Sequence, residues 1–320
     1  MTRDSASGAA FEAAVQSHAA DQASRPGFAL VQAWQGMDLA GIRRHLVAAL
    51  RAVGIDEADD DARFLIGHVL EPVSLAQALA DAALWSWQDA TRLADLAALR
   101  LQRVPLSQIL GSKPFWTLDL KVTGDVLTPR ADTEALVEAV LARCADKPLH
   151  MLDLGTGSGA ILAALLSERP AWTGQGVDLS PAALAVAQQN IDACALTARA
   201  QLARGRWGES LRGHSFDLVV SNPPYIVREV LARLEPEVRD HEPALALDGG
   251  EDGLDAYRVI MADLPRLLRP GGWFALEIGY DQGAAVLALA QAAGLTALEC
   301  LPDLSGHDRV VLGRAVLQNG

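Results

Sequence analysis

The chain has 320 residues, half of them hydrophobic, so it is long enough for two domains with packed cores and is not disordered over most of its length. It carries 27 Lys and Arg against 40 Asp and Glu, a net charge of −13, which argues against binding nucleic acid through a general basic surface but does not exclude a local basic patch. No apolar run is long enough to span a membrane, and the first residues lack the apolar core of a secretory signal.

The three cysteines, Cys144, Cys194 and Cys300, are far apart, and no two histidines have the spacing of a zinc site. We interpret the cysteines as small hydrophobic residues in a reducing, cytoplasmic compartment, and we expect no metal ion and no membrane partner.

Residues 1–36 are rich in Ala, Ser and Gln with only short apolar stretches, which predicts a poorly ordered leader. From Met37 on, apolar residues recur at helical spacing. Residues 37–105 are therefore expected to form a small helical bundle, with segments near 37–50, 62–70, 75–84 and 90–103.

The pattern changes after Pro105. Apolar and polar residues alternate over 115–122, as in a half-buried strand, and a turn at Gly124-Asp125 predicts that the chain returns as a hairpin. Residues 106–128 are accordingly predicted to form a β-hairpin linker.

Residues 129–320 begin with a predicted helix at 131–144 and then alternate short apolar strands with helices. This alternation predicts an α/β domain with a mostly parallel sheet covered by helices on both faces. The loop 302–309 is too short for a parallel crossover, so the last two strands should pair antiparallel. Seven strands are expected, at 151–154, 175–178, 200–203, 216–221, 273–278, 297–301 and 310–312.

A glycine-rich segment follows the first of these strands and precedes a helix. Glycine permits a sharp turn and a close approach of backbone to a ligand. An acid two residues before the first glycine suits a cation better than a pyrophosphate, and S-adenosylmethionine carries an ammonium and a sulfonium group. A plain tight turn is the structural alternative. The segment reads Asp153-Leu-Gly155-Thr156-Gly157-Ser158-Gly159.

A second acid, Asp178, ends the second strand. A carboxylate in this place can accept hydrogen bonds from both ribose hydroxyls of an adenosine, which both NAD and S-adenosylmethionine contain. An acid here can instead cap a helix, but Ser180-Pro181 already offers a cap and leaves Asp178 freer for a ligand.

The fourth strand ends in Ser221-Asn222-Pro223-Pro224-Tyr225. The prolines stiffen the backbone and leave carbonyl oxygens directed outward, and Asn222 adds a side-chain carbonyl. Two fixed acceptors can hold both hydrogens of a planar –NH₂ group, while Tyr225 offers a flat face to rest against. Held in this way, the weakly nucleophilic nitrogen can be aimed at a methyl donor. The alternative is a proline-rich turn that ends the strand and binds no ligand.

Together these motifs resemble those class I S-adenosylmethionine-dependent methyltransferases that act on a planar –NH₂ group. These enzymes have a Rossmann-like fold. The flanking segments resemble the bacterial release factor glutamine methyltransferase family over about residues 37–313. They are Pro105–Gly111, Phe115-Trp116, Thr128–Glu134, His241–Leu245, Asp252–Leu254, Glu277–Tyr280 and Gly306–Val310.

The resemblance implies transfer of a methyl group from S-adenosylmethionine to the side-chain nitrogen (N5) of the glutamine in the Gly-Gly-Gln motif of class-1 peptide chain release factors. The helical domain would help dock the release factor, and S-adenosylhomocysteine would be the product. Asn222 and Pro223 would be the catalytic pair that grips the amide, and the substrate site would add Pro224, Tyr225 and Phe115. The implied cofactor residues are Asp153, Gly155, Thr156, Gly157, Ser158, Gly159, Asp178, Trp207 and Asn222.

The chain departs from the family pattern at a few positions. Arg206 stands where the family usually has an acid before the tryptophan, which puts a contact to the adenine amino group in doubt, and Gly208 and Ala131 replace a common Phe and Pro. Met37 aligns with the usual first residue, so a mis-assigned start codon is one hypothesis.

Two other functions stay open. One is an –NH₂ methyltransferase acting on adenine or guanine of DNA or RNA, which should carry a basic target-recognition segment that we do not find. The other is a non-catalytic binding module with a degenerate methyltransferase, which the intact motifs disfavour.

Overall fold

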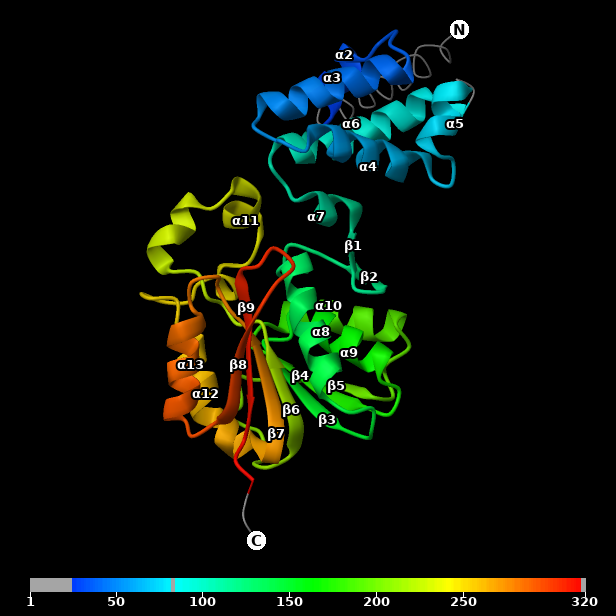
Figure 1. The fold of residues 1–320 in the computed structure, drawn as a ribbon. Helices are drawn as coiled ribbons and strands as arrows, with labels where there is room; N and C mark the ends of the chain where they lie inside the picture. Colours follow the sequence, from blue (N-terminus) through cyan, green and yellow to red (C-terminus); the bar gives the residue numbers. More distant parts are fainter. Residues whose placement is uncertain (1–24, 82–83, 318–320) are drawn as a thin grey trace, which may run out of the picture. The chain divides into compact units, whose positions relative to one another are not determined.

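The computed structural model describes residues 25–81 and 84–317, which divide into two compact units, one ending at Leu110 and the other beginning at Gly111 (Figure 1). The first unit is helical. Its helices are α2 (Phe28–Ala33), α3 (Leu39–Ala52), α4 (Ala58–Leu70), α5 (Leu75–Ala80), α6 (Trp87–Leu101) and α7 (Leu106–Leu110).

Local sequence explains where these helices begin. The Asp38 side chain accepts a hydrogen bond from the backbone of Gly41 at the start of α3, while Ser74 and Ser86 form capping boxes at α5 and α6. One apolar face of α3 is buried in the unit's core, and a buried ion pair between Asp61 and Arg100 (2.6 Å) joins α4 to α6.

The predicted leader is partly wrong. Residues 1–24 lie outside the described residues, but Phe28–Ala33 forms α2, and Trp34 is completely buried, with its indole N–H donating to His45 Nδ1 at 3.0 Å. A six-residue helix spans fewer than two turns, which is too short for apolar periodicity to reveal it.

The second unit opens with the hairpin β1 (Ser112–Phe115) and β2 (Leu118–Lys121), which pair antiparallel. The predicted turn at Gly124-Asp125 is present, with Val126 N–H donating to Thr123 O at 3.4 Å, but it is not the turn of the hairpin, because the chain reverses at Trp116-Thr117. Trp116 adopts a left-handed conformation (φ 56°), and its backbone N–H donates to Glu134 Oε1 at 2.8 Å. Continuous alternation through this turn, without Gly, Asn or Asp, hid it from the sequence pattern.

A seven-stranded sheet forms the centre of the second unit, as predicted. Its spatial order is β5-β4-β3-β6-β7-β9-β8; the first five are parallel, and β9 runs antiparallel to both β7 and β8. The strands are β3 (His150–Leu154), β4 (Thr173–Asp178), β5 (Ala200–Arg204), β6 (Phe216–Ser221), β7 (Leu268–Glu277), β8 (Thr296–Pro302) and β9 (Asp308–Arg314).

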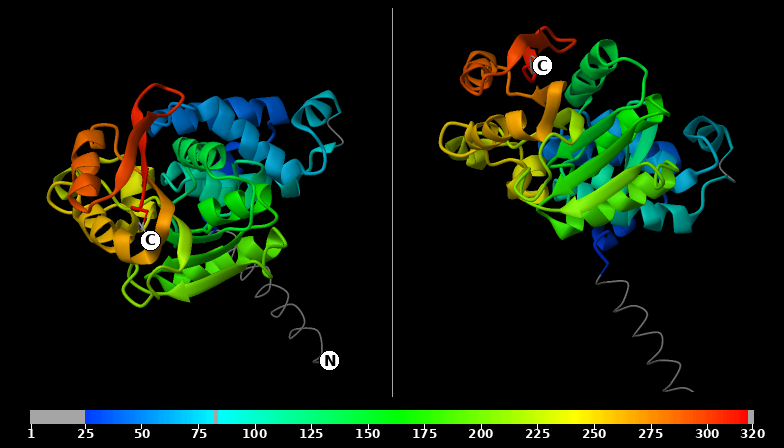
Figure 2. Two further views of the ribbon diagram at one scale, coloured as in Figure 1. Left: turned by 60° about the horizontal axis from the view of Figure 1, so that its bottom comes forward. Right: turned by 90° about the horizontal axis from the view of Figure 1, so that it is seen from below.

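Helices cover both faces of this sheet (Figures 1 and 2). Successive side chains of a strand point to opposite faces, so Met151 packs in the core under α8 and α9, and Leu152 in the core under α12 and α13. The helices are α8 (Glu134–Arg143), which follows the short helix η2 (Ala131–Thr133), α9 (Ala160–Glu168), α10 (Pro181–Ala193), α12 (Asp255–Leu267) and α13 (Gly283–Ala292).

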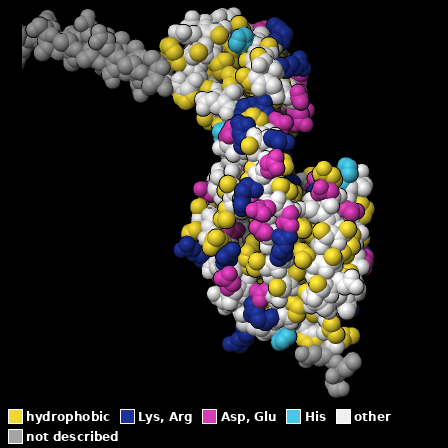
Figure 3. All heavy atoms as spheres, turned by 90° about the vertical axis from the view of Figure 1, so that its left-hand side faces the viewer, with side chains coloured by type: hydrophobic (Ala, Val, Ile, Leu, Met, Phe, Trp, Pro, Cys, Tyr) yellow, Lys and Arg dark blue, Asp and Glu magenta, His cyan; other side chains and the backbone are white. Residues whose placement is uncertain are grey.

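Between β6 and α12 the chain forms three short helices, η3 (Arg228–Arg233), α11 (Pro236–His241) and η4 (Ala244–Ala246). On the face of the second unit drawn in Figure 3, acidic and basic side chains are interspersed. Among the helices of the described ranges, none combines the length and apolar character that crossing a membrane requires.

Candidate functional site

Three of the predicted site segments meet at one edge of the sheet. Strands β4, β3 and β6 are parallel neighbours, so their carboxyl ends lie side by side. Asp178 ends β4, the glycine loop follows β3, and Asn222 follows β6. This edge of a parallel sheet is where ligands bind in open α/β folds.

The glycine loop requires glycine for its conformation. Gly155, Gly157 and Gly159 have φ of 69°, 55° and 79°, a region that side chains disfavour. The backbone N–H groups of Gly155 and Thr156 donate to Val177 O of β4 at 2.8 and 3.0 Å. The loop is thus pinned to the neighbouring strand.

Asp153 is buried beneath this loop. Its Oδ2 accepts a hydrogen bond from the Thr156 hydroxyl at 2.6 Å, but its Oδ1 has no partner within the described residues. Burial raises the pKa of Asp153 to about 7, the bond from Thr156 opposes the rise, and nearby Asp178 adds to it. A buried carboxylate with an unused oxygen is suited to an ammonium or sulfonium ligand.

Asp178 is already engaged by the backbone. Its Oδ2 accepts from Gly157 N at 2.9 Å and its Oδ1 from Ser180 N at 2.8 Å. Ser180 caps α10 through Ala183 N, as expected from the sequence. Each carboxylate oxygen retains acceptor capacity, so Asp178 can receive two hydroxyls of a ribose while it holds the glycine loop.

Trp207 lies against the same loop. A Cβ placed on Gly155 would lie 3.5 Å from the Trp207 ring, and Trp207 itself has a left-handed backbone (φ 49°). The ring therefore flanks the glycine loop, where a flat adenine could rest against it.

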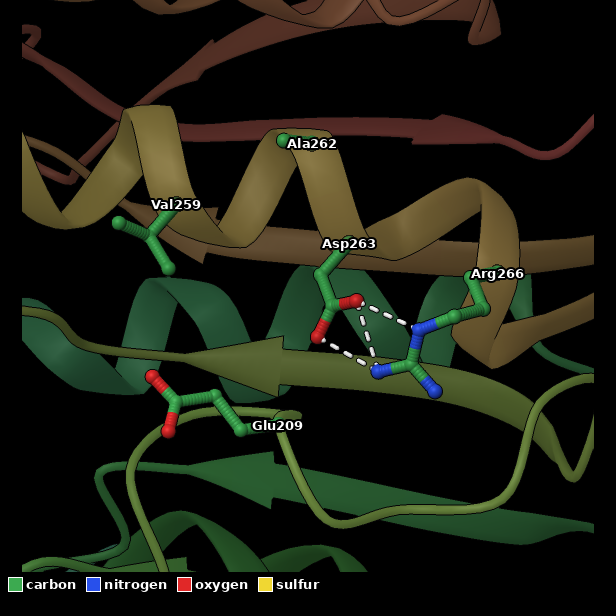
Figure 4. A pocket seen from close by; sticks show the side chains of 5 residues that line it. All are labelled: Glu209, Val259, Ala262, Asp263 and Arg266. Carbon is green, nitrogen blue, oxygen red and sulfur yellow. Dashed lines mark hydrogen bonds and ion pairs between the residues drawn. The ribbon is translucent and has the colours of Figure 1, made fainter.

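The ion pair of Arg266 and Asp263 lies against the segment that contains Trp207 and supports it. The Arg266 guanidinium of α12 donates to Gly208 O and Leu211 O, both at 2.7 Å, and pairs with Asp263 one turn earlier. Figure 4 shows this pair lining a surface hollow together with Glu209, Val259 and Ala262. The hollow contains none of the predicted site residues, and Arg266 matters here because its hydrogen bonds support the Trp207 segment.

At the end of β6, Asn222 is half-buried and Pro223 is buried. The Asn222 amide donates from Nδ2 to the Thr133 hydroxyl at 3.2 Å. The Tyr225 hydroxyl donates to Glu277 Oε1 at 3.4 Å, and Gln282 donates to Tyr225 O at 3.1 Å. Side chains from η2, β7 and the start of α13 thus fix the segment.

Several supporting residues were quoted in the sequence motifs without an assigned role. Arg130 pairs with buried Glu242 at 2.6 Å, which ties the segment before η2 to the end of α11. Arg309 pairs with Asp132 at 3.4 Å and with Asp303 at 3.1 Å. The sequence shows that these residues are oppositely charged, but it does not show which of them pair with one another.

Asn190 of α10 was missed altogether. It is buried, accepts from Lys121 N at 2.7 Å through Oδ1 and donates to Ser158 O at 2.9 Å through Nδ2. It therefore links the hairpin to the glycine loop. An isolated polar residue on a helix carries no sequence signal for such a role.

The remaining predicted residues are placed as follows. Phe115 is 1% exposed and packs in the core beneath the hairpin, so its place in a substrate pocket stays a prediction. Thr156 and Ser158 are buried within the glycine loop. Within the ranges the structure describes, no cluster of His, Cys, Asp or Glu could hold a metal ion.

Parts of both units match models of known protein families. Residues 42–111 match the family model of the PrmC N-terminal domain, and residues 131–234 match that of the methyltransferase small domain. Proteins named release factor glutamine methyltransferase are similar over most of their length. The one from Caulobacter vibrioides is 51% identical, covering 82% of this chain and 92% of the relative. The one from Cereibacter sphaeroides is 46% identical, covering 87% and 99%.

Among solved structures, the catalytic domain of hMettl16, in complex with the MAT2A 3'UTR hairpin 6, is similar in fold. It superposes with a TM-score of 0.52 at 16% identity, covering 70% of this chain and 83% of that one. The likeness at this identity concerns the fold alone.

Proposed function

The chain belongs to the release factor glutamine methyltransferase family, and from this premise we propose that it transfers a methyl group from S-adenosylmethionine to the side-chain amide nitrogen of a glutamine in a peptide chain release factor. The glutamine of a Gly-Gly-Gln motif in class-1 factors is the proposed target. The enzyme needs no metal in this proposal.

The observation that supports the proposal most directly is the pairing of two unlike sites at adjoining strand ends. Beneath the glycine loop, Asp153 has a buried carboxylate oxygen without a hydrogen-bond partner among the described residues, and Asn222 lies at the end of the next strand of the sheet. A site for a positively charged methyl donor therefore adjoins a site for a neutral amide.

Each residue has a proposed task. Asp153 and Asp178 bind the charged and ribose ends of the cofactor, and Trp207 flanks its base. S-adenosylmethionine, when bound, supplies an electrophilic methyl group. Asn222 Oδ1 and the Pro223 carbonyl accept the two amide hydrogens, orient the nitrogen lone pair, and stabilise the charge that develops on nitrogen. The surplus proton then leaves to water.

The test offers purified enzyme and labelled S-adenosylmethionine to a release factor, to its Gln→Ala variant at the Gly-Gly-Gln motif, and to a DNA and an RNA oligonucleotide. We expect label on the release factor only, lost with the Gln→Ala variant. Asn222→Ala should lower transfer about 100-fold while cofactor affinity stays within about two-fold. Label on an oligonucleotide and none on the release factor would refute the proposal.

A further inference from the structure

Gln282, which directly precedes α13, connects three separate segments of the second unit. It is 9% exposed, and its side-chain amide forms three hydrogen bonds with backbone groups. Oε1 accepts from Gly279 N at 2.9 Å, while Nε2 donates to Tyr225 O and to Gly253 O, both at 3.1 Å. Gly279 follows β7, Tyr225 follows β6, and Gly253 precedes α12. A single buried side chain therefore joins the end of the segment Asn222–Tyr225 to two other loops.

The identity of these partners fixes the orientation of the Gln282 amide. A backbone N–H can only donate and a backbone C=O can only accept, so the direction of each bond follows from the covalent structure. If the amide were turned over, Nε2 would face the N–H of Gly279 and Oε1 would face two carbonyl oxygens. Three hydrogen bonds would then be lost. The observed orientation is therefore the one in which Gln282 can hold Tyr225 O.

Gln282 does not act as an ordinary helix cap. It occupies the N-cap position of α13, but within the part of the chain that the structure describes, its side chain makes no capping hydrogen bond to that helix. Its three side-chain bonds lead to loops instead. This indicates a role in placing those loops rather than in starting α13.

The backbone of Tyr225 is closely enclosed. A Cβ on Gly249 would lie 2.7 Å from Tyr225 C, and a Cβ on Gly253 would lie 2.5 Å from Tyr225 O and 2.6 Å from Gln282 Nε2, distances that side chains do not tolerate. The next peptide is fixed as well, since Gly249 N donates to Ile226 O at 2.8 Å. The Tyr225 peptide thus has a closely defined place, and Gln282 supplies the hydrogen bond to its carbonyl.

A fixed Tyr225 peptide also places Asn222 and Pro223. The two residues between Asn222 and Tyr225 are prolines, whose rings fix φ and restrict the residue before each of them. At its other end the segment is held by the Ser221 hydroxyl, which donates to Leu154 O of β3 at 2.5 Å. A displacement of Tyr225 is therefore transmitted along a stiff backbone to the two proposed acceptors, Asn222 Oδ1 and Pro223 O.

We infer that Gln282 is a positioning residue for methyl transfer, which sets the Asn222 and Pro223 acceptors by holding the carbonyl of Tyr225. The inference rests on the proposed function, because the substrate amide is the group that these acceptors would bind. Misplaced acceptors affect the transition state more than they affect the binding of the whole release factor. Loss of the Gln282 amide should therefore lower kcat and change KM little.

The primary test uses Gln282→Glu and Gln282→Met, which both keep roughly the length of the side chain. Glutamate keeps an acceptor for Gly279 N but supplies at most one hydrogen for two carbonyls, and methionine supplies none. Both variants should lower kcat with the release factor roughly ten-fold, while KM and cofactor affinity by direct titration stay within about three-fold of wild type. Unchanged kcat in either variant, or a loss of cofactor affinity as large as the loss of kcat, would overturn the inference.

A second test asks whether Gln282 acts through Asn222. In an Asn222→Ala background, Gln282→Met should lower kcat by a smaller factor than in the wild type, because one of the two acceptors that Gln282 places is already gone. The same factor in both backgrounds would mean that Gln282 acts independently of Asn222, contrary to the inference.

The matched controls are Gln291→Glu and Gln291→Met, the same substitutions at an exposed position of α13, which should leave kcat unchanged. Thermal unfolding is measured for each variant. If neither Gln282 variant folds, Gln282 is a residue of the fold and the inference fails. An inactive wild type would refute the proposed function, whereas an active wild type with an unaffected Gln282→Met would refute only the positioning role of Gln282.

Discussion

At the scale of single residues, the two carboxylate oxygens of Asp178 take part in several hydrogen bonds at once. It binds the backbone at Gly157 and Ser180 and is proposed to accept two ribose hydroxyls as well. Asp178→Ala removes charge-assisted hydrogen bonds and releases the glycine loop. Since each such bond contributes about 1.5–3 kcal/mol, the dissociation constant for S-adenosylmethionine should rise at least about ten-fold in isothermal titration.

Asp192→Ala is the control for this variant, because Asp192 lies near the C-terminal end of α10, and among the described residues its carboxylate accepts hydrogen bonds from the side chains of Gln188 and Thr197. Its cofactor affinity should match the wild type. Unchanged affinity in Asp178→Ala would refute the ribose assignment.

The sequence indicated the candidate residues of the glycine loop and of Asn222–Tyr225 because each set forms a short motif whose chemistry is local. In Gly155–Gly159 the glycines permit the left-handed conformation that the loop adopts, and in Asn222–Tyr225 the two prolines restrict the backbone. Residues that act through long-range pairing could not be predicted in this way. Glu242 binds Arg130 across more than a hundred residues, and neither side chain specifies its partner.

At the scale of secondary-structure elements, α12 supports the cofactor site through Arg266. Arg266→Met keeps much of the apolar stem and removes the hydrogen bonds to Gly208 O and Leu211 O. The segment with Trp207 should become more mobile, so cofactor affinity should fall about three- to ten-fold, the equivalent of one hydrogen bond.

Arg269→Met is a suitable control, because Arg269 is a neighbouring arginine whose ion pair is with Asp217, away from Trp207. Tryptophan fluorescence quenching by the cofactor analogue S-adenosylhomocysteine would measure both variants. Equal cofactor affinities for Arg266→Met and Arg269→Met would contradict the role of Arg266 in supporting the Trp207 segment.

Helix α2 and Trp34 belong to the core of the first unit. Trp34 is completely buried and hydrogen-bonds His45 of α3. Trp34→Ala should therefore lower the free energy of unfolding by about 3–5 kcal/mol, measured by urea denaturation. A chain that starts at Met37 lacks Trp34 and should show a similar loss.

The control is Trp87→Ala, at the start of α6, where the side chain is 48% exposed and its removal should cost far less. Equal stability of the wild type and the chain starting at Met37 would indicate that α2 contributes little.

At the scale of the whole molecule, the alternation of apolar strands and helices was sufficient to predict the seven-stranded sheet of the second unit. Seven strands with an antiparallel end follow from strand burial and from one short loop, 302–309. The hairpin turn was not predictable, because Trp116 adopts its left-handed conformation although it is not one of the residue types that usually form turns. Helix α2 was not predictable either, because Phe28–Ala33 is too short to show a periodic pattern.

Two buried carboxyl groups should give the ligand-free protein a characteristic pH dependence. Burial raises the pKa of both Asp153 and Glu277 to about 7, above their unfolded values. The folded state therefore holds these protons more tightly. The resulting stability is fully present below about pH 4 and is lost as pH rises through 7, by roughly 3–4 kcal/mol per group for shifts of this size.

The measurement is the free energy of unfolding between pH 5 and 8 for the wild type and Asp153→Asn. Burial lowers the pKa of His150, which acts in the opposite sense, so the difference between the two proteins isolates Asp153. That difference should shift in favour of Asp153→Asn as pH rises, because the amide has no charge to bury. Asp240→Asn is the control, since Arg239 lowers the pKa of exposed Asp240 and places its titration below this window. A pH-independent difference for Asp153→Asn would mean that Asp153 is not held protonated beneath the glycine loop.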